Sequence, residues 1–260
     1  MKINKLIISL AFMIYFLPCY LFSQSYAGSE ASVELMMLVD KPTAGLLKHG
    51  TYAVSGSFFQ RGGILFGIYV GVFEPFTFGI SYGGTDIIGH DVVHMNPLPG
   101  VLAKLRIFDE GAINPAIAVG FDSQGREPYM DADSLERYTI KSPGLFLVAS
   151  KNYDLLGYLS LHCGINKTLE TKDGDKDLNV FLGVEKSLGK DISVIFEYDF
   201  AFNDDNNNAA GKGNGYLNFG FRWSWGKGLV MGVNLKNITR NQNDIHFGNR
   251  TLQIDYTGSF

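Results

Sequence analysis

The chain has little cysteine, proline and tryptophan, with two, eight and two residues among 260. Cys163 is the only cysteine outside the N-terminal apolar stretch, so the sequence excludes a small fold stapled by internal disulfides. Beyond that stretch no apolar run is long enough to cross a bilayer as a helix. Acidic residues outnumber basic ones, 26 to 22, which gives no reason to expect a nucleic-acid partner.

Glycine and aromatic residues are abundant instead. The chain has 31 glycines, and Phe, Trp and Tyr make up 13% of it. At 46% hydrophobic and 18% charged residues it is not a disordered chain. The combination of glycine and aromatic residues is common in β-barrels, which need tight turns and interfacial rings.

The N-terminal sequence has the pattern of a secretory signal peptide. Lys2 and Lys5 precede an apolar run over residues 6–17, and small residues follow. Cleavage after Ser23 or after Ala27 fits the pattern. A lipid anchor on Cys19 is disfavoured because Pro18 precedes it where a small residue is needed. The expected division is a signal peptide at 1–27, a periplasmic N-terminal segment at 28–49 and a barrel at 50–260.

The last nine residues alternate strictly between apolar and polar side chains. Leu252, Ile254, Tyr256 and Phe260 fall on one face of an extended strand, while Gln253, Asp255, Thr257 and Ser259 fall on the other. A final strand that ends on phenylalanine resembles the C-terminal strand of outer-membrane barrels, where the barrel assembly machinery reads a terminal aromatic residue. The resemblance implies that Tyr256 and Phe260 form an assembly signal.

The same two-faced pattern recurs along the chain and predicts about twelve strands. They cover residues 51–59, 64–73, 76–82, 101–108, 114–123, 145–151, 158–166, 178–186, 192–202, 216–225, 229–237 and 252–260. Most are close to the length that a tilted membrane strand requires.

The connections between these strands alternate in length. Short turns at 74–75, 109–112, 152–154, 187–191 and 226–228 alternate with polar loops at 83–100, 124–143, 167–177, 203–215 and 238–249, apart from one short turn at 60–63. This predicts an all-β fold, a transmembrane antiparallel up-and-down β-barrel of about 12 strands in the outer membrane of a Gram-negative bacterium, with both termini periplasmic. A soluble β-sandwich also alternates, but it does not explain the signal peptide, loop lengths and terminal Phe260 together.

Two short stretches suggest a family. Segments of YjbH-type barrels resemble two parts of this chain. One is residues 41–50, Lys-Pro-Thr-Ala-Gly-Leu-Leu-Lys-His-Gly, and the other is the pair 183–189 and 192–199, which contains Glu185, Glu197 and Asp199. Those barrels are associated with exopolysaccharide export, and this chain is shorter than their typical members. The resemblance implies a barrel and a link to that export. Otherwise the chain resembles the small uncharacterised β-barrels of Gram-negative bacteria.

The candidate functional residues of the lumen are the charged residues at the alternate strand positions that are predicted to face the barrel interior. They are Lys104, Arg106, Asp122, His162, Glu185, Glu197, Asp199, Arg222, Lys236 and Asp255. On one interpretation acids and bases on neighbouring strands pair with each other in a ladder inside a narrow barrel. On the other, Lys104 and Arg106 oppose an acidic wall and select a polar solute, as charged rings do in pores.

Enzymatic and metal functions have weaker support. Ser160 and His162 share a face and could act as nucleophile and base, but such a pair is mostly a hydrogen-bonding arrangement. His90, Asp91 and His94 form a loose cluster, as do Asp173 and Asp175, without the ligand number of a known metal site. We therefore expect no enzyme, no metal and no cofactor.

The sequence leaves two functions open. The first is a narrow, porin-like channel for small polar or saccharide solutes. The second is a non-conducting structural or interaction barrel with a paired and plugged lumen; a lipid-modifying barrel enzyme is less favoured. Residues 28–49 are a linker, a plug or a contact for a partner. The expected partners are outer-membrane lipid, the barrel assembly machinery and a polysaccharide or small polar solute; no nucleic acid is expected.

Overall fold

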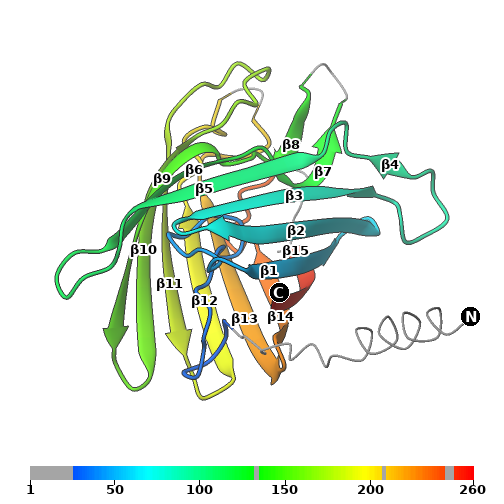
Figure 1. Ribbon diagram of the computed structural model, residues 1–260. Helices are drawn as coiled ribbons and strands as arrows, with labels where there is room; N and C mark the ends of the chain where they lie inside the picture. Colours follow the sequence, from blue (N-terminus) through cyan, green and yellow to red (C-terminus); the bar gives the residue numbers. More distant parts are fainter. Residues whose placement is uncertain (1–25, 132–134, 207–208, 244–248) are drawn as a thin grey trace, which may run out of the picture.

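The computed structural model describes residues 26–131, 135–206, 209–243 and 249–260 (Figure 1). Most of the predicted signal peptide, with Cys19 and the Ser23 cleavage position, lies outside the described residues. The described part is all-β. Its strands are β1 (Thr51–Phe59), β2 (Gly63–Phe73), β3 (Phe76–Thr85), β4 (His94–Met95), β5 (Gly100–Phe108), β6 (Ala116–Asp122), β7 (Arg126–Met130), β8 (Arg137–Ile140), β9 (Gly144–Asp154), β10 (Tyr158–Lys167), β11 (Asn179–Ser187), β12 (Ile192–Asp199), β13 (Tyr216–Gly226), β14 (Leu229–Lys236) and β15 (Asn249–Ser259).

Twelve of these strands form a closed antiparallel barrel, as the sequence predicts. Each barrel strand pairs with its neighbours in the chain, and β15 pairs with β1 to close the ring. The closing register places Thr51 opposite Ser259 and Phe58 opposite Leu252. Closure leaves no free sheet edge in the ring, because β2 also pairs with β3. Within the described residues, no helix is long and apolar enough to cross a membrane.

The outer surface of the barrel is apolar on strand after strand. The exposed residues include Phe66, Ile68, Ile80, Leu105, Leu147, Leu161, Leu182, Phe196, Trp223, Val233 and Leu252. These positions alternate with buried, mostly polar ones, which face the lumen. A soluble monomer rarely exposes so extensive an apolar surface.

The strand boundaries differ from the prediction mainly at the loop end of the barrel, where the long connections lie. The predicted polar loop 124–143 contains β7 and β8, which form a separate two-stranded sheet at this end (Figure 1). The loop 83–100 contributes β4, which pairs with the end of β3. The opposite end, which we call the turn end, has short connections. Phe260 lies there, with its N–H 2.9 Å from the Gly50 carbonyl oxygen.

Residues 26–50 fill much of the barrel interior (Figure 1). This segment enters from the turn end, where the N–H of Ser29 lies 2.7 Å from the carbonyl oxygen of Gly189. It reverses in a tight turn closed by a 2.8 Å hydrogen bond from the Leu38 N–H to the Lys41 carbonyl, with a β-bridge between Met37 and Pro42. It then returns to β1. We call residues 33–47 the lumen hairpin.

The lumen hairpin explains why β9 has apolar residues on both faces. Leu145 and Leu147 point outward, whereas Phe146 and Val148 are buried in a cluster that includes Ala44 of the hairpin. A second cluster joins Leu38 and Val39 to Ile195 of β12. Gly183 of β11 leaves room for this contact, because a Cβ atom there would lie 2.2 Å from a Leu38 methyl carbon. The alternation in the inner wall is therefore broken where the hairpin packs against it.

Candidate functional site: the filled lumen

The tip of the lumen hairpin is held by one carboxylate. Glu197 of β12 accepts hydrogen bonds on Oε2 from the backbone N–H groups of Val39, Asp40 and Lys41, at 3.0, 2.8 and 2.8 Å. Its other oxygen accepts a 2.8 Å bond from the Asn218 side chain. Glu197 is fully buried. Three N–H groups around one oxygen form an anion-binding turn, which fixes the tip against β12.

Two ion pairs flank this contact. Lys41 Nζ lies 2.8 Å from an Asp199 oxygen, and Lys236 Nζ lies 2.9 Å from an Asp40 oxygen. All four side chains are almost completely buried. Removing one partner of such a pair would leave an uncompensated charge inside the barrel, which is strongly destabilising. The tip is therefore locked by charge as well as by hydrogen bonds.

Basic side chains of the wall bind the hairpin backbone. Lys104 Nζ donates to the carbonyls of Met36 and Thr43, at 2.9 and 3.2 Å. Arg106 donates to the carbonyl of Ala44 at 2.7 Å and forms an ion pair with Glu34. The Met36 carbonyl also accepts the Thr43 N–H within the hairpin, at 3.1 Å, so these wall contacts add to the hairpin's own pairing.

Two further residues from the predicted set also contact the N-terminal segment. Arg222 donates to the Leu38 carbonyl at 3.2 Å and to the Asn234 side chain at 2.6 Å. Asp255 accepts a hydrogen bond from the hydroxyl of Tyr26, near the start of the described segment. Among the described residues no ion pair joins two of the ten predicted residues, so the pairing that the ladder interpretation requires is not seen there. Six of the ten have partners in the hairpin, which occupies the space between the walls: Lys104, Arg106, Glu197, Asp199, Arg222 and Lys236.

His162 and Glu185 lie on adjacent strands but bond to other neighbours. His162 Nδ1 is 2.8 Å from Ser150 Oγ, which also accepts the Ala44 N–H at 2.9 Å. Ser160 donates instead to Asn152 of β9, so the disfavoured Ser160–His162 pair does not form. Glu185 accepts a 2.8 Å bond from the Tyr158 hydroxyl.

The two loop clusters considered for metals differ in their surroundings. His90, Asp91 and His94 are exposed in the loop between β3 and β5. Asp173 is buried and neutralised by two cations, as described below, while Asp175 accepts backbone N–H groups. In the described part of the chain, no group of three or more His, Cys, Asp or Glu residues could hold a metal ion.

The β7–β8 sheet closes over the hairpin from the loop end. Glu127 of β7 lies 2.9 Å from Lys236 Nζ and accepts hydrogen bonds from Gln242 and Asn249. Burial alone raises the pKa of Glu127, but the ion pair and these amide bonds outweigh it and hold the pKa below its ordinary value. Lys236 thus links the lumen hairpin to the β7–β8 sheet.

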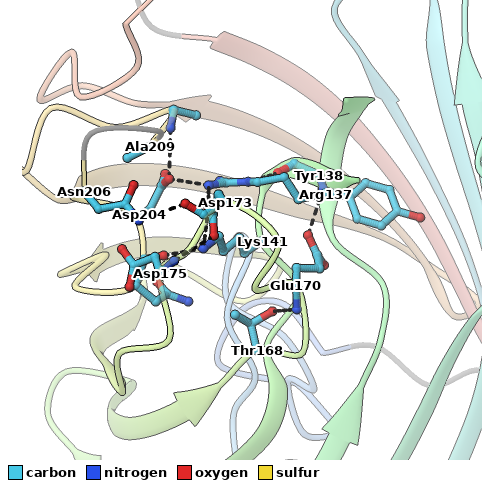
Figure 2. Close-up of polar contacts among 12 residues, drawn as sticks. Arg137, Tyr138, Lys141, Thr168, Glu170, Asp173, Asp175, Asp204, Asn206 and Ala209 are labelled. Atoms are coloured by element: carbon cyan, nitrogen blue, oxygen red, sulfur yellow. Dashed lines mark hydrogen bonds and ion pairs between the residues drawn. The ribbon is translucent and has the colours of Figure 1, made fainter. Parts of the chain in front are cut away.

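A buried network fixes the other strand of this sheet (Figure 2). Arg137 Nη1 lies 2.7 Å from Asp173 and 2.6 Å from Asp204, and Lys141 Nζ lies 2.6 Å from the same Asp173 oxygen. Figure 2 shows these groups converging from three different loop-end segments. Glu170 accepts the N–H groups of Tyr138 and Ser142, while its burial raises its pKa.

A cavity remains between the lumen hairpin and one side of the wall. Its volume is about 100 Å³, and it lies along β1, β2, β14 and β15. The wall contributes small or hydroxyl-bearing side chains such as Ala53, Ser55, Ser57 and Thr251, and the hairpin contributes Leu35, Met36 and Met37. Arg126 and Glu127 of β7 line the same space. The site is therefore a lumen with the hairpin on one side and, on the other, a cavity between polar wall residues and apolar hairpin residues.

Sequence patterns missed several of these residues. Asp40 and Lys41 belong to a segment without strand periodicity, and the backbone groups that bind Glu197 leave no side-chain signal. Arg126, Glu127 and Arg137 lie in a stretch interpreted as a polar loop. The short alternation at 137–140 was the available indication of a strand there.

Comparisons with known proteins give structural neighbours only. No protein-family model matches the chain, and no curated protein matches it. Among solved structures, the KdgM porin is 12% identical with a TM-score of 0.49, and covers 81% of this chain and 99% of its own. The NanC porin is 7% identical with a TM-score of 0.44, and covers 80% and 99%. The translocator domain of the autotransporter NalP from Neisseria meningitidis is 12% identical with a TM-score of 0.37, and covers 81% and 86%. These comparisons do not show the resemblance to YjbH-type barrels.

Proposed function

We propose that this chain is an outer-membrane β-barrel that passes small polar solutes and that the lumen hairpin controls the passage. The exposed apolar belt of the closed ring supports insertion in a bilayer, where a barrel leaves no backbone group unpaired. The short connections and Phe260 then face the periplasm, and the long loops face outward. The barrel assembly machinery and membrane lipid are the partners that this placement requires.

The observation that carries the proposal is the polar lock on the hairpin. Glu197, Asp199 and Lys236 hold the tip through hydrogen bonds and ion pairs, and Lys104 and Arg106 hold its carbonyls. Water can replace such partners when the hairpin moves, whereas a hairpin held mainly by apolar burial would leave a dry wall behind it. The lumen wall is therefore suited to be hydrated once the hairpin leaves.

A static plug is the second candidate function. The clusters around Leu38 and Ala44 are fully buried, and the Arg137 network fixes the β7–β8 sheet over the same lumen. On this alternative the barrel is a scaffold that presents its long loops to a partner. A link to exopolysaccharide export rests on the sequence resemblance at 41–50 and 183–199 alone.

Planar-bilayer recordings test the proposal. Two purified chains are compared: the full protein and a variant in which residues 34–45 are replaced by a glycine-serine linker. Folding of both is checked by the heat-dependent shift in gel mobility that folded barrels show. We expect rare, small conductance steps from the full protein and frequent, larger steps from the variant. A folded variant that conducts no ions would overturn the channel function and favour the static plug.

A further inference from the structure

The cavity beside the lumen hairpin is lined by two charged side chains, Arg126 and Asp122, that have few partners in the described part of the chain. Arg126 of β7 lines this cavity, and no hydrogen bond or ion pair joins its guanidinium to another residue in the described ranges. Asp122 of β6 lines it too, and among the described residues its carboxylate accepts one hydrogen bond, from the backbone N–H of Gln124 at 2.9 Å. The two side chains attract each other but are not in contact as an ion pair.

The other charged groups around this cavity are already bound. Lys236 holds both Asp40 and Glu127, and the Glu34 carboxylate is paired with Arg106. Asp255 accepts hydrogen bonds from Tyr26 and from Gln253. A ligand in the cavity can therefore accept hydrogen bonds from the Arg126 guanidinium and donate one to the Asp122 carboxylate.

An aromatic platform faces the same space. Tyr69 points inward from β2, and its ring lies flat along the wall over two glycines. A Cβ atom added to Gly67 would lie 2.6 Å from the Tyr69 hydroxyl, and one added to Gly79, its partner on β3, would lie 2.1 Å from the ring. Because these glycines let the ring lie on the wall, one face of Tyr69 is turned to the cavity.

We infer that this cavity binds a neutral, hydroxyl-rich ligand of the saccharide class, through Arg126, Asp122 and Tyr69. A sugar hydroxyl accepts a hydrogen bond and donates one, so adjacent hydroxyls can bridge the guanidinium and the carboxylate. The apolar face of the sugar ring covers Tyr69. An anionic ligand would be attracted by Arg126 but repelled by Asp122 and its acidic neighbours. This inference rests on the proposed function and names its substrate class.

Calorimetric titration of the detergent-solubilised full chain tests the inference without a membrane. The probes are glucose, glucuronate and glucosamine, which share a ring and differ in charge. We expect glucose to bind, and its affinity to fall at least about tenfold in Arg126→Gln and in Asp122→Asn. Tyr69→Phe, which keeps the ring, retains binding, whereas Tyr69→Leu weakens it.

The matched control is Arg61→Gln, because Arg61 is an exposed arginine paired with Asp86 at the loop end. Binding of glucuronate alone would overturn the inference and make the site an anion site. Binding of glucosamine alone, or of no probe, would overturn it as well. Conductance is recorded separately, so a barrel that conducts without binding glucose refutes this inference and leaves the proposed function standing.

Discussion

The Glu197 lock gives the sharpest prediction. In Glu197→Gln the amide oxygen can still face the N–H groups of Val39, Asp40 and Lys41, but the negative charge is lost. Hydrogen bonds to a charged acceptor contribute about 1 kcal/mol more than neutral ones. Three such bonds are affected, so the hairpin tip should be held less tightly by about 3 kcal/mol. That difference raises the population of the released tip about 100-fold.

Hydrogen–deuterium exchange of peptides covering residues 38–44 measures this population, because amide exchange follows local opening. We expect those amides to exchange about 100-fold faster in the variant, while amides of the barrel strands keep their rates. The matched control is Glu185→Gln on β11, a buried lumen carboxylate whose bond is to Tyr158. Unchanged exchange at 38–44 in Glu197→Gln, or equal acceleration in Glu185→Gln, would refute the reasoning.

Three further predictions follow from other contacts. Gly183→Ala should destabilise the docked hairpin by about 1–3 kcal/mol, because the new methyl group collides with Leu38. The control is Gly56→Ala, where the added Cβ lies 3.8 Å from its nearest atom and should have no such effect. Thermal unfolding and amide exchange at residues 38–44 compare the two variants. Glu127 has a pKa below its unfolded value of 4.5, so it stabilises docking of β7 fully above pH 4.5 and loses this contribution as pH falls through the lowered pKa. Exchange at 126–130, corrected for intrinsic pH dependence, should show that loss in the wild type and not in Glu127→Gln. Deleting Phe260 should reduce the yield of assembled barrel in cells more than it changes the fold in detergent; equal yields would contradict its role as an assembly signal.

Much of the barrel could be predicted because each strand separates two environments. On β13 the alternation of Leu217, Phe219, Phe221 and Trp223 with polar residues defines both faces, and the predicted range ends one residue short of the observed strand. On β9 the same argument could not assign a face, because Phe146 and Val148 are covered by the hairpin rather than by water. Periodicity reports the surroundings of a strand, and here those surroundings include a distant part of the chain.

The candidate site was predictable only in part, for a related reason. The inward positions of residues such as Lys104 and Glu197 follow from strand parity. Their partners do not, because Glu197 binds backbone N–H groups and Lys104 binds carbonyls, which every sequence contains. The lock on the hairpin is therefore a property of the folded chain that no side-chain pattern encodes.

Control of the lumen by the hairpin is the central claim, and a reversible cross-link tests it most directly. The Ala44 N–H lies 2.9 Å from Ser150 Oγ, so the hairpin and β9 are in contact there, and cysteines at these two positions are tested for a disulfide between them. The recording uses Glu197→Gln with Ala44→Cys and Ser150→Cys, in a chain without Cys19 and Cys163. We predict large conductance steps after reduction and their loss after oxidation. Equal conductance of the oxidised and reduced protein, with the cross-link verified, would contradict the account.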